Sequence, residues 1–535
     1  MILNRKKKKR EELQNTFGEV KDDSFHFDLI ERYFRAKDNS NAFQTLSDKT
    51  CNDLDFNELF MFVDRTHSKV GQQYLYQTLR TIPKSGNTFD EILVDRFLND
   101  LEFRTSVQLQ LEELKSNDAC YISTLFQEEH QKAPKWFFVT KILSVLSLVS
   151  VLFIPVFQQV IFFLFGIFII NMVIHFWNKR NLYQYLGSIP QLLRLTKVAA
   201  ELYRDERLAP QNRELEKSLK AISGIKRRLS FFRLEAKMDN DIAALVAGFI
   251  ELFKILFLIE PLFLFGVLKR LDSMRREMDE MFSFVGKIDV LLSVASLRKG
   301  APKYCIPKIS TQAKKLQAKN LYHPLVSDCV ENDIEIDQKS VLLTGSNMSG
   351  KTTFIRTVGT NVITGQTLNT CFAADFEMPR MRVFSAIRIS DDLLNDKSYY
   401  FEEVLTIKTM LEAGNENVPN LFLLDEIFKG TNTIERISAG KAVLSSLADA
   451  GNIVLVSTHD IELADLLHDE YALFHFSEKV NHKTVDFDYR IKDGKLKTRN
   501  AIRILEINDY PESITKEANS ISNVLDKNNQ NRAVR

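Results

Sequence analysis

The chain of 535 residues is too long for one hydrophobic core, and its length predicts about two to four domains. Lys and Arg total 71 against 70 Asp and Glu, and this net charge of +1 excludes a chain-wide basic field for nucleic acid. The 5 cysteines include no C-x-x-C pair, which argues against a disulfide framework or a structural zinc site and fits reduced cytosolic thiols.

The first segment of the chain is basic. Residues 5–10 read RKKKKR, so residues 1–26 are predicted to form a basic N-terminal tail that is solvated and disordered. Attraction of this run to anionic lipid headgroups or to nucleic acid stays open as the alternative. Residues 27–135 then carry apolar side chains at three- and four-residue spacing, as at Val70, Tyr74 and Leu75, and are predicted to form a helical core.

Residues 136–177 are almost entirely apolar, and Lys141 is their only formally charged residue. A membrane-spanning helix needs about 20 apolar residues, so this run is long enough for two helices. The sequence PVFQQ at 155–159 supplies a break, and Trp136 and Trp177 stand at the outer ends, where interfacial rings belong. We expect a transmembrane helical hairpin in the cell membrane with basic, cytoplasmic flanks; a buried hairpin in a soluble core is the alternative.

Residues 178–301 are predicted to form a helical lever region that is rich in charge. Its apolar stretch Ile242–Leu268 is interrupted by two glutamates, a lysine and a proline, so we expect a buried or interfacial helix pair and not a third span. From Leu271 to Leu292, apolar residues recur at three- and four-residue spacing over six turns. This pattern predicts one long amphipathic helix with a solvated charged face.

Beyond Pro302, short apolar runs alternate with helical stretches. The runs VLLT (341–344), LFLLD (421–425) and IVLVS (453–457) are each followed by a turn and a helical pattern. Such runs are typical of parallel strands that are buried on both faces. Residues 302–520 are therefore predicted to form an α/β nucleotide-binding domain, and residues 521–535 a polar C-terminal tail.

The run TGSNMSGKTT at 344–353 contains the spacing G-x-x-x-x-G-K-T. In such a loop several backbone N–H groups point at one anion, and the following helix adds the positive end of its dipole. We expect Lys351 to reach the β- and γ-phosphates of a nucleotide and the Thr352 hydroxyl to hold Mg²⁺.

Two further strand ends carry polar side chains. Asp425 ends a buried strand, where its carboxylate can reach the Mg²⁺, and Glu426 follows as the candidate general base for water. His459 comes just after the run IVLVST. Because the ends of the three strands should converge on one edge, we expect His459 to sense the γ-phosphate, with a structural role as the alternative.

These segments resemble, in the same order, those of the MutS family, the ATPases of DNA mismatch repair. TGSNMSGKTT is similar to the family's TGPNMGGKST, including its Asn-Met pair; LLDEIFKGTNT (423–433) resembles DEIGRGTST, and STHDIEL (457–463) resembles THYxEL. Residues 384–404 resemble the segment with the family's trans-acting serine, and residues 489–518 its closing hairpin and helix. The likeness is dense and specific over about residues 270–520, which include the end of the lever at 288–297, and it is looser over about residues 27–130.

The resemblance implies binding and hydrolysis of ATP with Mg²⁺ at a composite site between the ATPase domains of a homodimer. The residues that it assigns to ATP binding are Gly345, Ser346, Asn347, Met348, Ser349, Gly350, Lys351, Thr352 and Thr353. It implies Mg²⁺ ligation by Thr352 and Asp425, and catalytic roles for Lys351, Glu426 and His459.

One contact is expected across the dimer, from Ser398 to the ATP of the partner subunit. The family's GRGT is replaced by Phe428, Lys429 and the following Gly-Thr, so a glycine of that loop is lost. We expect the family's mismatch-recognition domain to be lacking, since about 26 residues before the core are too few for it, and the hairpin stands where the DNA clamp would be inserted. The basic run 225–228 (IKRR) is the nearest candidate for phosphate contact, against a plain solvated helix face.

The expected fold is α plus α/β: a helical core and lever domain with an inserted transmembrane hairpin, then a P-loop NTPase (ABC-like) α/β domain. The expected function is a membrane-anchored MutS-like ATPase with a cytoplasmic ATPase domain and ATP-dependent, mismatch-repair-like DNA binding. The alternative is a membrane-tethered, ATP-driven scaffold or remodelling switch that does not bind DNA.

Overall fold

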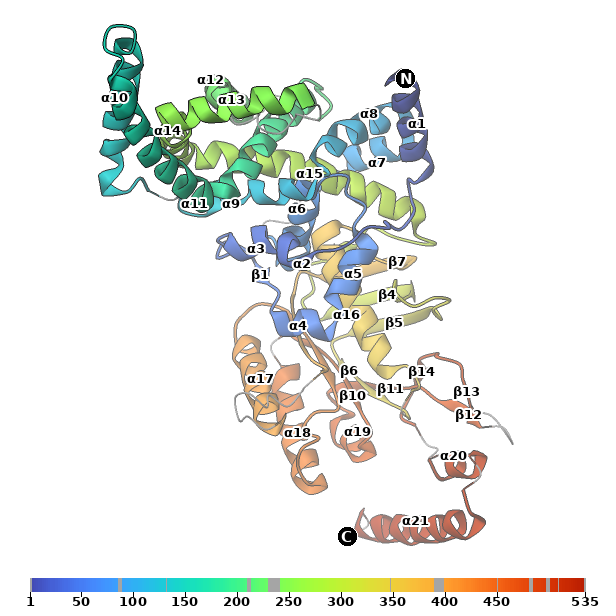
Figure 1. The fold of residues 1–535 in the computed structure, drawn as a ribbon. Coiled ribbons are helices and arrows are strands. Elements are labelled where there is room, and N and C mark those ends of the chain that lie inside the picture. The colour runs from blue at the N-terminus through green and yellow to red at the C-terminus, as the bar shows by residue number, and fades with distance from the viewer. Residues whose placement is uncertain are drawn as a thin grey trace. The chain divides into compact units, whose positions relative to one another are not determined.

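The computed structural model describes residues 2–84, 89–130, 132–208, 213–229, 241–346, 348–388, 399–449, 451–480, 485–496, 501–508 and 510–533. The chain divides into two compact units (Figure 1). The helical unit consists of Met1–Asp38, Val63–Thr78 and Asp90–Gly300. The α/β unit consists of Asn39–Phe62, Leu79–Phe89 and Ala301–Arg535.

The described part of the helical unit is built from helices joined by short turns. Their bounds are α1 Ile2–Asn15, α2 Phe27–Ile30, α3 Arg32–Ala36, α6 Lys69–Arg80, α7 Glu91–Asn99, α8 Leu101–Leu111, η1 Glu112–Leu114, η2 Asn117–Ile122, α9 Thr124–Gln127, η3 Lys135–Phe137, α10 Phe138–Phe153, α11 Val160–Tyr203, α12 Arg213–Leu229, α13 Asp241–Phe257, α14 Ile259–Asp272 and α15 Arg275–Gly300. The η elements are 3₁₀ helices.

The prediction of a disordered basic tail at residues 1–26 is wrong for α1, which is helical from Ile2 to Asn15. Lys9 lies 3.2 Å from a carboxylate oxygen of Glu112, and Arg10 lies 2.9 Å from one of Glu102. Leu13 of the same helix is buried. The basic run is therefore ordered because acidic side chains of α8 and η1 face it and one apolar side chain packs beneath it.

The apolar run forms two helices with a break where it was expected. Lys135–Phe153 and Val160–Asn178 are both long and apolar enough to cross a membrane, and only 22% and 17% of these stretches are buried within the protein. The helices α10 and α11 lie side by side (Figure 1), with Pro155 in the turn between them. The rings of Trp136 and Trp177 lie 5.1 Å apart, so both mark the same end of the hairpin.

The lever prediction needs a correction. The stretch Ile242–Leu268 does form a helix pair, α13 and α14, which meets at Leu258, a buried residue with φ of +49°. However, α14 ends at Asp272 and α15 begins at Arg275, so one continuous helix through Leu271 is wrong. Nor is the polar side of α15 simply solvated, because Asp289, Ser293 and Ser296 are buried among neighbouring segments.

Asp289 of α15 organises the turn that leads into α6. Its carboxylate accepts hydrogen bonds from the backbone N–H of His67 at 2.9 Å, the N–H of Ser68 at 2.8 Å and the Ser68 hydroxyl at 2.5 Å. The Ser68 hydroxyl oxygen in turn accepts from the N–H of Gly71 at 2.8 Å. Burial raises the pKa of Asp289, and these donors oppose that effect. The carboxylate thus holds the turn before α6, and the Ser68 hydroxyl satisfies a free N–H group in the first turn of that helix.

Replacing Gly71 with Ala is expected to destabilise the protein by about 1–3 kcal/mol, because an added Cβ would overlap the Asp289 carboxylate. A matched control is Gly266→Ala in α14, where a Cβ meets nothing within 4 Å. That variant gains up to about 1 kcal/mol from helix propensity. Thermal unfolding of the two full-length variants measures the contrast; a Gly71→Ala protein that melts with the parent would show that the carboxylate yields freely.

The α/β unit contains the remaining elements. Its strands are β1 Gln44–Thr45, β2 Thr81–Ile82, β3 Lys308–Ser310, β4 Lys315–Leu321, β5 Asn332–Asp337, β6 Ser340–Thr344, β7 Asp375–Pro379, β8 Arg382–Ala386, β9 Asn420–Asp425, β10 Ile453–Thr458, β11 Tyr471–His475, β12 Glu478–Val480, β13 Val485–Phe487 and β14 Lys492–Asp493. Its helices are α4 Asp48–Asp53, α5 Phe56–Val63, α16 Lys351–Leu368, α17 Tyr399–Gly414, α18 Thr433–Ala448, α19 Ile461–Leu467, α20 Ala501–Ile507 and α21 Glu512–Ala533. The helix α21 covers residues 521–533, which were expected to be a polar tail.

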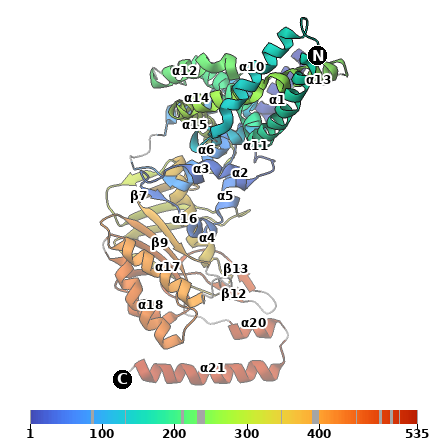
Figure 2. The same ribbon diagram turned by 60° about the vertical axis from the view of Figure 1, so that its left-hand side comes forward.

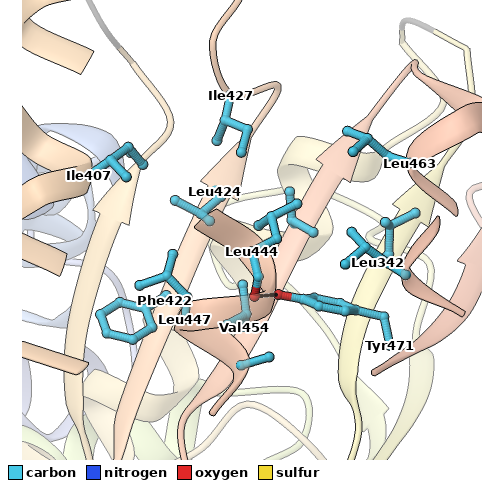
Figure 3. Close-up of a cluster of buried hydrophobic side chains, with 14 of the residues drawn as sticks. Leu342, Ile407, Phe422, Leu424, Ile427, Leu444, Leu447, Val454, Leu463 and Tyr471 are labelled. Carbon is cyan, nitrogen blue, oxygen red and sulfur yellow. Dashed lines mark hydrogen bonds between the residues drawn. The ribbon is translucent and has the colours of Figure 1, made fainter. Parts of the chain in front are cut away.

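The parallel sheet predicted from the apolar runs is confirmed. Six strands lie in the order β14-β11-β6-β10-β9-β8, and the neighbours from β11 to β8 are parallel. Phe422, Leu424 and Val454 from the sheet pack against Leu444 and Leu447 of α18 (Figure 3). The hydroxyl of the buried Tyr471 donates to the Leu444 carbonyl at 2.8 Å. Figure 2 shows α17 and α18 side by side.

A second, four-stranded sheet in the order β3-β7-β4-β5 was not predicted. The expected helical core of residues 27–135 also loses segments 39–62 and 79–89 to the α/β unit. The amide of Gln44 pairs with both the N–H and the carbonyl of Val383 on the edge strand β8, each at 2.7 Å. Asp53 accepts from the Ser385 hydroxyl at 2.7 Å. These side chains close the open edge of the sheet, which explains why the segments belong there.

Candidate nucleotide-binding site

The glycine loop connects β6 to α16 in a conformation that needs its glycines. Gly350 has φ of +106° and is the N-cap of α16, and Gly345 has φ of +156°. A Cβ at Gly345 would lie 2.8 Å from the Phe476 carbonyl oxygen and 2.9 Å from the Ser349 hydroxyl. The loop therefore runs closely along its neighbours and leaves the N-terminus of an 18-residue helix facing the pocket.

Lys351 is buried inside the loop. Its Nζ donates to the carbonyl oxygens of Gly345 at 2.9 Å and Ser346 at 2.8 Å. Burial lowers the pKa of this amine, while the neighbouring carboxylates of Asp425 and Glu426 favour its charged form. The loop carbonyls therefore hold the ammonium group of Lys351 in place. An anion such as phosphate would attract this group more strongly than the neutral carbonyls do.

The ends of β6, β9 and β10 converge as expected. Thr344 is in register with Thr458, and Ser457 with Asp425. The Thr352 hydroxyl donates to Asp425 Oδ2 at 2.7 Å, and the Ser457 hydroxyl donates to Asp425 Oδ1. The structure thus brings together the hydroxyl and the carboxylate that were predicted to share Mg²⁺. Ser457 was missed, although it stands two residues before His459 in the sequence.

Glu426 and His459 are in contact, which the sequence did not predict. Glu426 Oε1 lies 2.7 Å from His459 Nε2, and its Oε2 lies 2.9 Å from Lys429 Nζ. The hydrogen bond from His459 is the main reason why the pKa of Glu426 falls to about 2, with Lys429 adding to the effect and partial burial opposing it. The carboxylate is therefore ionised, and both of its oxygens are engaged.

The loop that departs from the family pattern is well packed. Phe428 is buried, with φ of +59°, and its N–H donates to Glu403 Oε1 at 2.5 Å. Lys429 occupies the second oxygen of Glu426. Glu403 of α17 was not a predicted site residue, and burial raises its pKa. No local signal could have identified it, because it lies 25 residues before its partner.

A cavity of about 620 Å³ opens beside the loop. One wall contains Ser346, Met348, Ser349, Gly350, Lys351, Thr352, Thr353 and Glu426. A second part of the lining was not predicted: it is formed by residues 326–330, Asn332 and Tyr489. Asn332 ties this part together, since its Nδ2 donates to the Tyr489 carbonyl at 3.0 Å and its Oδ1 accepts from Ile491 N–H at 2.8 Å. The cavity joins the phosphate loop to a largely apolar surface.

Three other predictions concern residues or side chains that lie outside the described part of the structure. Asn347 of the loop and Ser398 before α17 lie outside the described residues. The run 225–228 lies near the end of α12, with side chains from 225 onward also outside the description. Their expected roles stay predictions.

One group in the helical unit has metal-ligand chemistry. His175 Nε2 lies 3.1 Å from Glu251, and His175 Nδ1 lies 3.6 Å from Glu260. Lys254 Nζ lies 3.7 Å from the other oxygen of Glu251. Nε2 is within hydrogen-bond distance of Glu251, whereas 3.6 Å between Nδ1 and Glu260 is longer than a hydrogen bond; the buried Lys254 already places a cation beside Glu251.

Comparisons with known proteins agree with the arrangement of the site. Residues 341–526 match the family model for MutS domain V. Three curated relatives, each named DNA mismatch repair protein MutS, come from Shouchella clausii, Petrotoga mobilis and Pseudothermotoga lettingae. They are 27%, 29% and 31% identical over 48%, 48% and 46% of this chain, and the matches cover 30%, 33% and 31% of the relatives' own lengths. The matches therefore span about a third of the length of these proteins, and the part of the chain that carries the site is similar to MutS domain V.

Proposed function

We propose that the protein is a Mg²⁺-dependent ATPase that works as a homodimer through its α/β units and couples ATP to DNA binding. The observation that carries this proposal is the hydrogen bond from the Thr352 hydroxyl to Asp425, because Thr352 lines the cavity together with the buried Lys351. A hydroxyl and a carboxylate are oxygen donors of the kind that Mg²⁺ prefers. In P-loop enzymes the bound ion neutralises the charge that develops on the transferred phosphate.

ATP fits the cavity at both ends. The loop and Lys351 supply backbone donors and a cation for phosphate, while Val326, Val330 and Tyr489 supply an apolar surface for the base. Met348, which is 82% exposed, also lines this cavity. The proposed occupant is therefore a whole nucleoside triphosphate and not a free phosphate.

The chain's own residues divide the proposed chemistry. Lys351 leaves the loop carbonyls to bind phosphate, and Thr352 and Asp425 hold Mg²⁺. Glu426 accepts a proton from the attacking water once one of its oxygens is released from His459 or Lys429. In this proposal His459 turns from Glu426 to contact the γ-phosphate. Ser398 of the partner subunit is proposed to complete the site, on the strength of the family resemblance.

A second candidate function is a membrane-tethered, ATP-driven scaffold or remodelling switch that does not bind DNA. It is favoured by α10 and α11, whose apolar side chains are largely exposed. We propose that this hairpin lies in the cell membrane, with the ATPase unit on the cytoplasmic side because both flanks are basic. The hairpin is compatible with either function, so a measurement of DNA binding distinguishes them.

The test is binding of the purified full-length protein, in detergent, to matched and mismatched duplex DNA, with ATP and Mg²⁺ and with a chelator. The proposal expects Mg²⁺-dependent hydrolysis and an affinity that falls with log salt by about one unit per phosphate contacted. Hydrolysis without any DNA binding at low salt supports the scaffold instead. Absence of Mg²⁺-dependent hydrolysis contradicts both functions.

A further inference from the structure

Glu403 is a fully buried carboxyl group at the start of α17, and it contacts the loop that follows β9 and contains Glu426 and Phe428. Its Oε1 accepts the N–H of Phe428 at 2.5 Å, and its Oε2 has no hydrogen-bond partner among the residues that the structure describes. Burying a carboxyl group is costly unless it is well paired. Burial of Glu403 costs free energy, and its carboxyl group accepts only one described hydrogen bond, from the backbone beside Glu426. This suggests that the bond has a role.

The bond holds a strained backbone. Glu426 has φ of +52° and Phe428 has φ of +59°, both in the left-handed region that residues with a Cβ rarely adopt. Such a conformation persists only where the surroundings impose it. One side of this loop is fixed by the Glu426 N–H, which donates to the Ser457 carbonyl at 2.9 Å, and the other by Glu403.

The side chain of Phe428 reinforces the same connection. Its ring is buried and lies 6.2 Å from the ring of Tyr400, which is also on α17. Both the backbone and the ring of Phe428 therefore contact α17. The direction of the Glu426 carboxylate, two residues earlier, depends on where this helix lies.

We propose that Glu403 is a positioning residue for ATP hydrolysis: by accepting the Phe428 N–H, it fixes the loop that aims Glu426 into the cavity. The inference rests on the proposed ATPase function and names a residue that does not touch ATP itself. What the loop needs from Glu403 is a hydrogen-bond acceptor at that position, not a negative charge. An amide oxygen in the same place does the same work.

The test compares three variants of the full-length protein by ATP binding and by steady-state hydrolysis. In Glu403→Ala and in the bulkier Glu403→Leu the acceptor is lost, and kcat is expected to fall at least about tenfold, since small misplacements of catalytic groups cost up to about a hundredfold. The KM for ATP stays within about twofold, because the phosphate loop is untouched. Glu403→Gln keeps the acceptor and is expected to stay within about threefold of the parent kcat.

The neighbouring Glu402→Ala is the matched control, since it removes the same group from the same turn of α17 and leaves the Phe428 bond in place. Unchanged kcat in both Glu403→Ala and Glu403→Leu would overturn the inference, and so would a Glu403→Gln enzyme as slow as they are. Thermal unfolding identifies a variant that does not fold, and the leucine variant, which fills the space, then decides. A parent protein without hydrolysis would instead refute the ATPase function itself.

Discussion

A Glu426→Gln variant is expected to bind ATP like the parent and to hydrolyse it about 10²–10⁴-fold more slowly, which is the usual contribution of a general base. The amide keeps the shape of the side chain but takes no proton from water. His459 and Lys429 lower the pKa of Glu426 to about 2, so the carboxylate is ionised at neutral pH while they hold it, and release of one oxygen from these partners makes it a stronger base. Single-turnover hydrolysis and equilibrium binding of ATP measure the two effects separately.

The matched control for this experiment is Glu462→Gln, an exposed glutamate in the first turn of α19. It removes one negative charge from the same unit and should leave both binding and turnover unchanged. If Glu426→Gln turned over ATP at the parent rate, the base would have to be another group. The Thr352–Asp425 pair and the cavity would then still describe a binding site, but the assigned chemistry would be wrong.

Where the glycine loop and the strand ends would meet could be predicted from short stretches of sequence. The spacing of Gly345, Gly350 and Lys351 reflects one turn between a strand and a helix, which local backbone geometry determines. Asp425 and His459 were found because parallel strands bring their carboxyl ends to one edge, a rule that needs only the apolar runs before them. The strand order β6-β10-β9 confirms that these strands are parallel neighbours whose ends lie at one edge.

The parts that depend on distant segments could not be predicted from a pattern. Glu403 and Phe428 meet only because α17 packs beside the loop, and neither position has a local signature. Asn332 and Tyr489 form one wall of the cavity across 157 residues of chain. Gln44 covers the edge of the sheet from a segment that reads as part of a helical core. In each case the decisive event is a polar side chain that satisfies backbone groups of a remote element.

One charge pattern and one apolar pattern led to wrong predictions of secondary structure. The run at residues 5–10 suggested a disordered tail, because the sequence does not show that Glu102 and Glu112 face it. The apolar spacing through Leu271 suggested one lever, because it does not show that the chain turns between Asp272 and Arg275. The spacing of apolar residues predicts which face of a helix is apolar, but it does not predict where one helix ends and the next begins.

The hairpin yields the second large prediction: introducing arginine at Val145 of α10 and Ile170 of α11 is expected to remove the protein from the membrane fraction. Both side chains lie near the middle of their apolar stretches and are 59% and 50% exposed. An arginine at the centre of a spanning helix opposes insertion by about 3 kcal/mol, so the pair together opposes it by about 6 kcal/mol. Fractionation of cells that express the double variant, with alkaline washing of the membranes, is the measurement.

The control is Ile434→Arg in α18, an isoleucine that is 79% exposed in the α/β unit. In water, exchanging an exposed apolar side chain for arginine is nearly free, so this variant should stay with the membrane like the parent. A hairpin that lies in water would make the two substitutions equivalent, and both proteins would then fractionate as the parent does. Arginine is therefore costly in lipid and nearly free in water. A difference in fractionation between the double variant and Ile434→Arg shows that lipid surrounds α10 and α11.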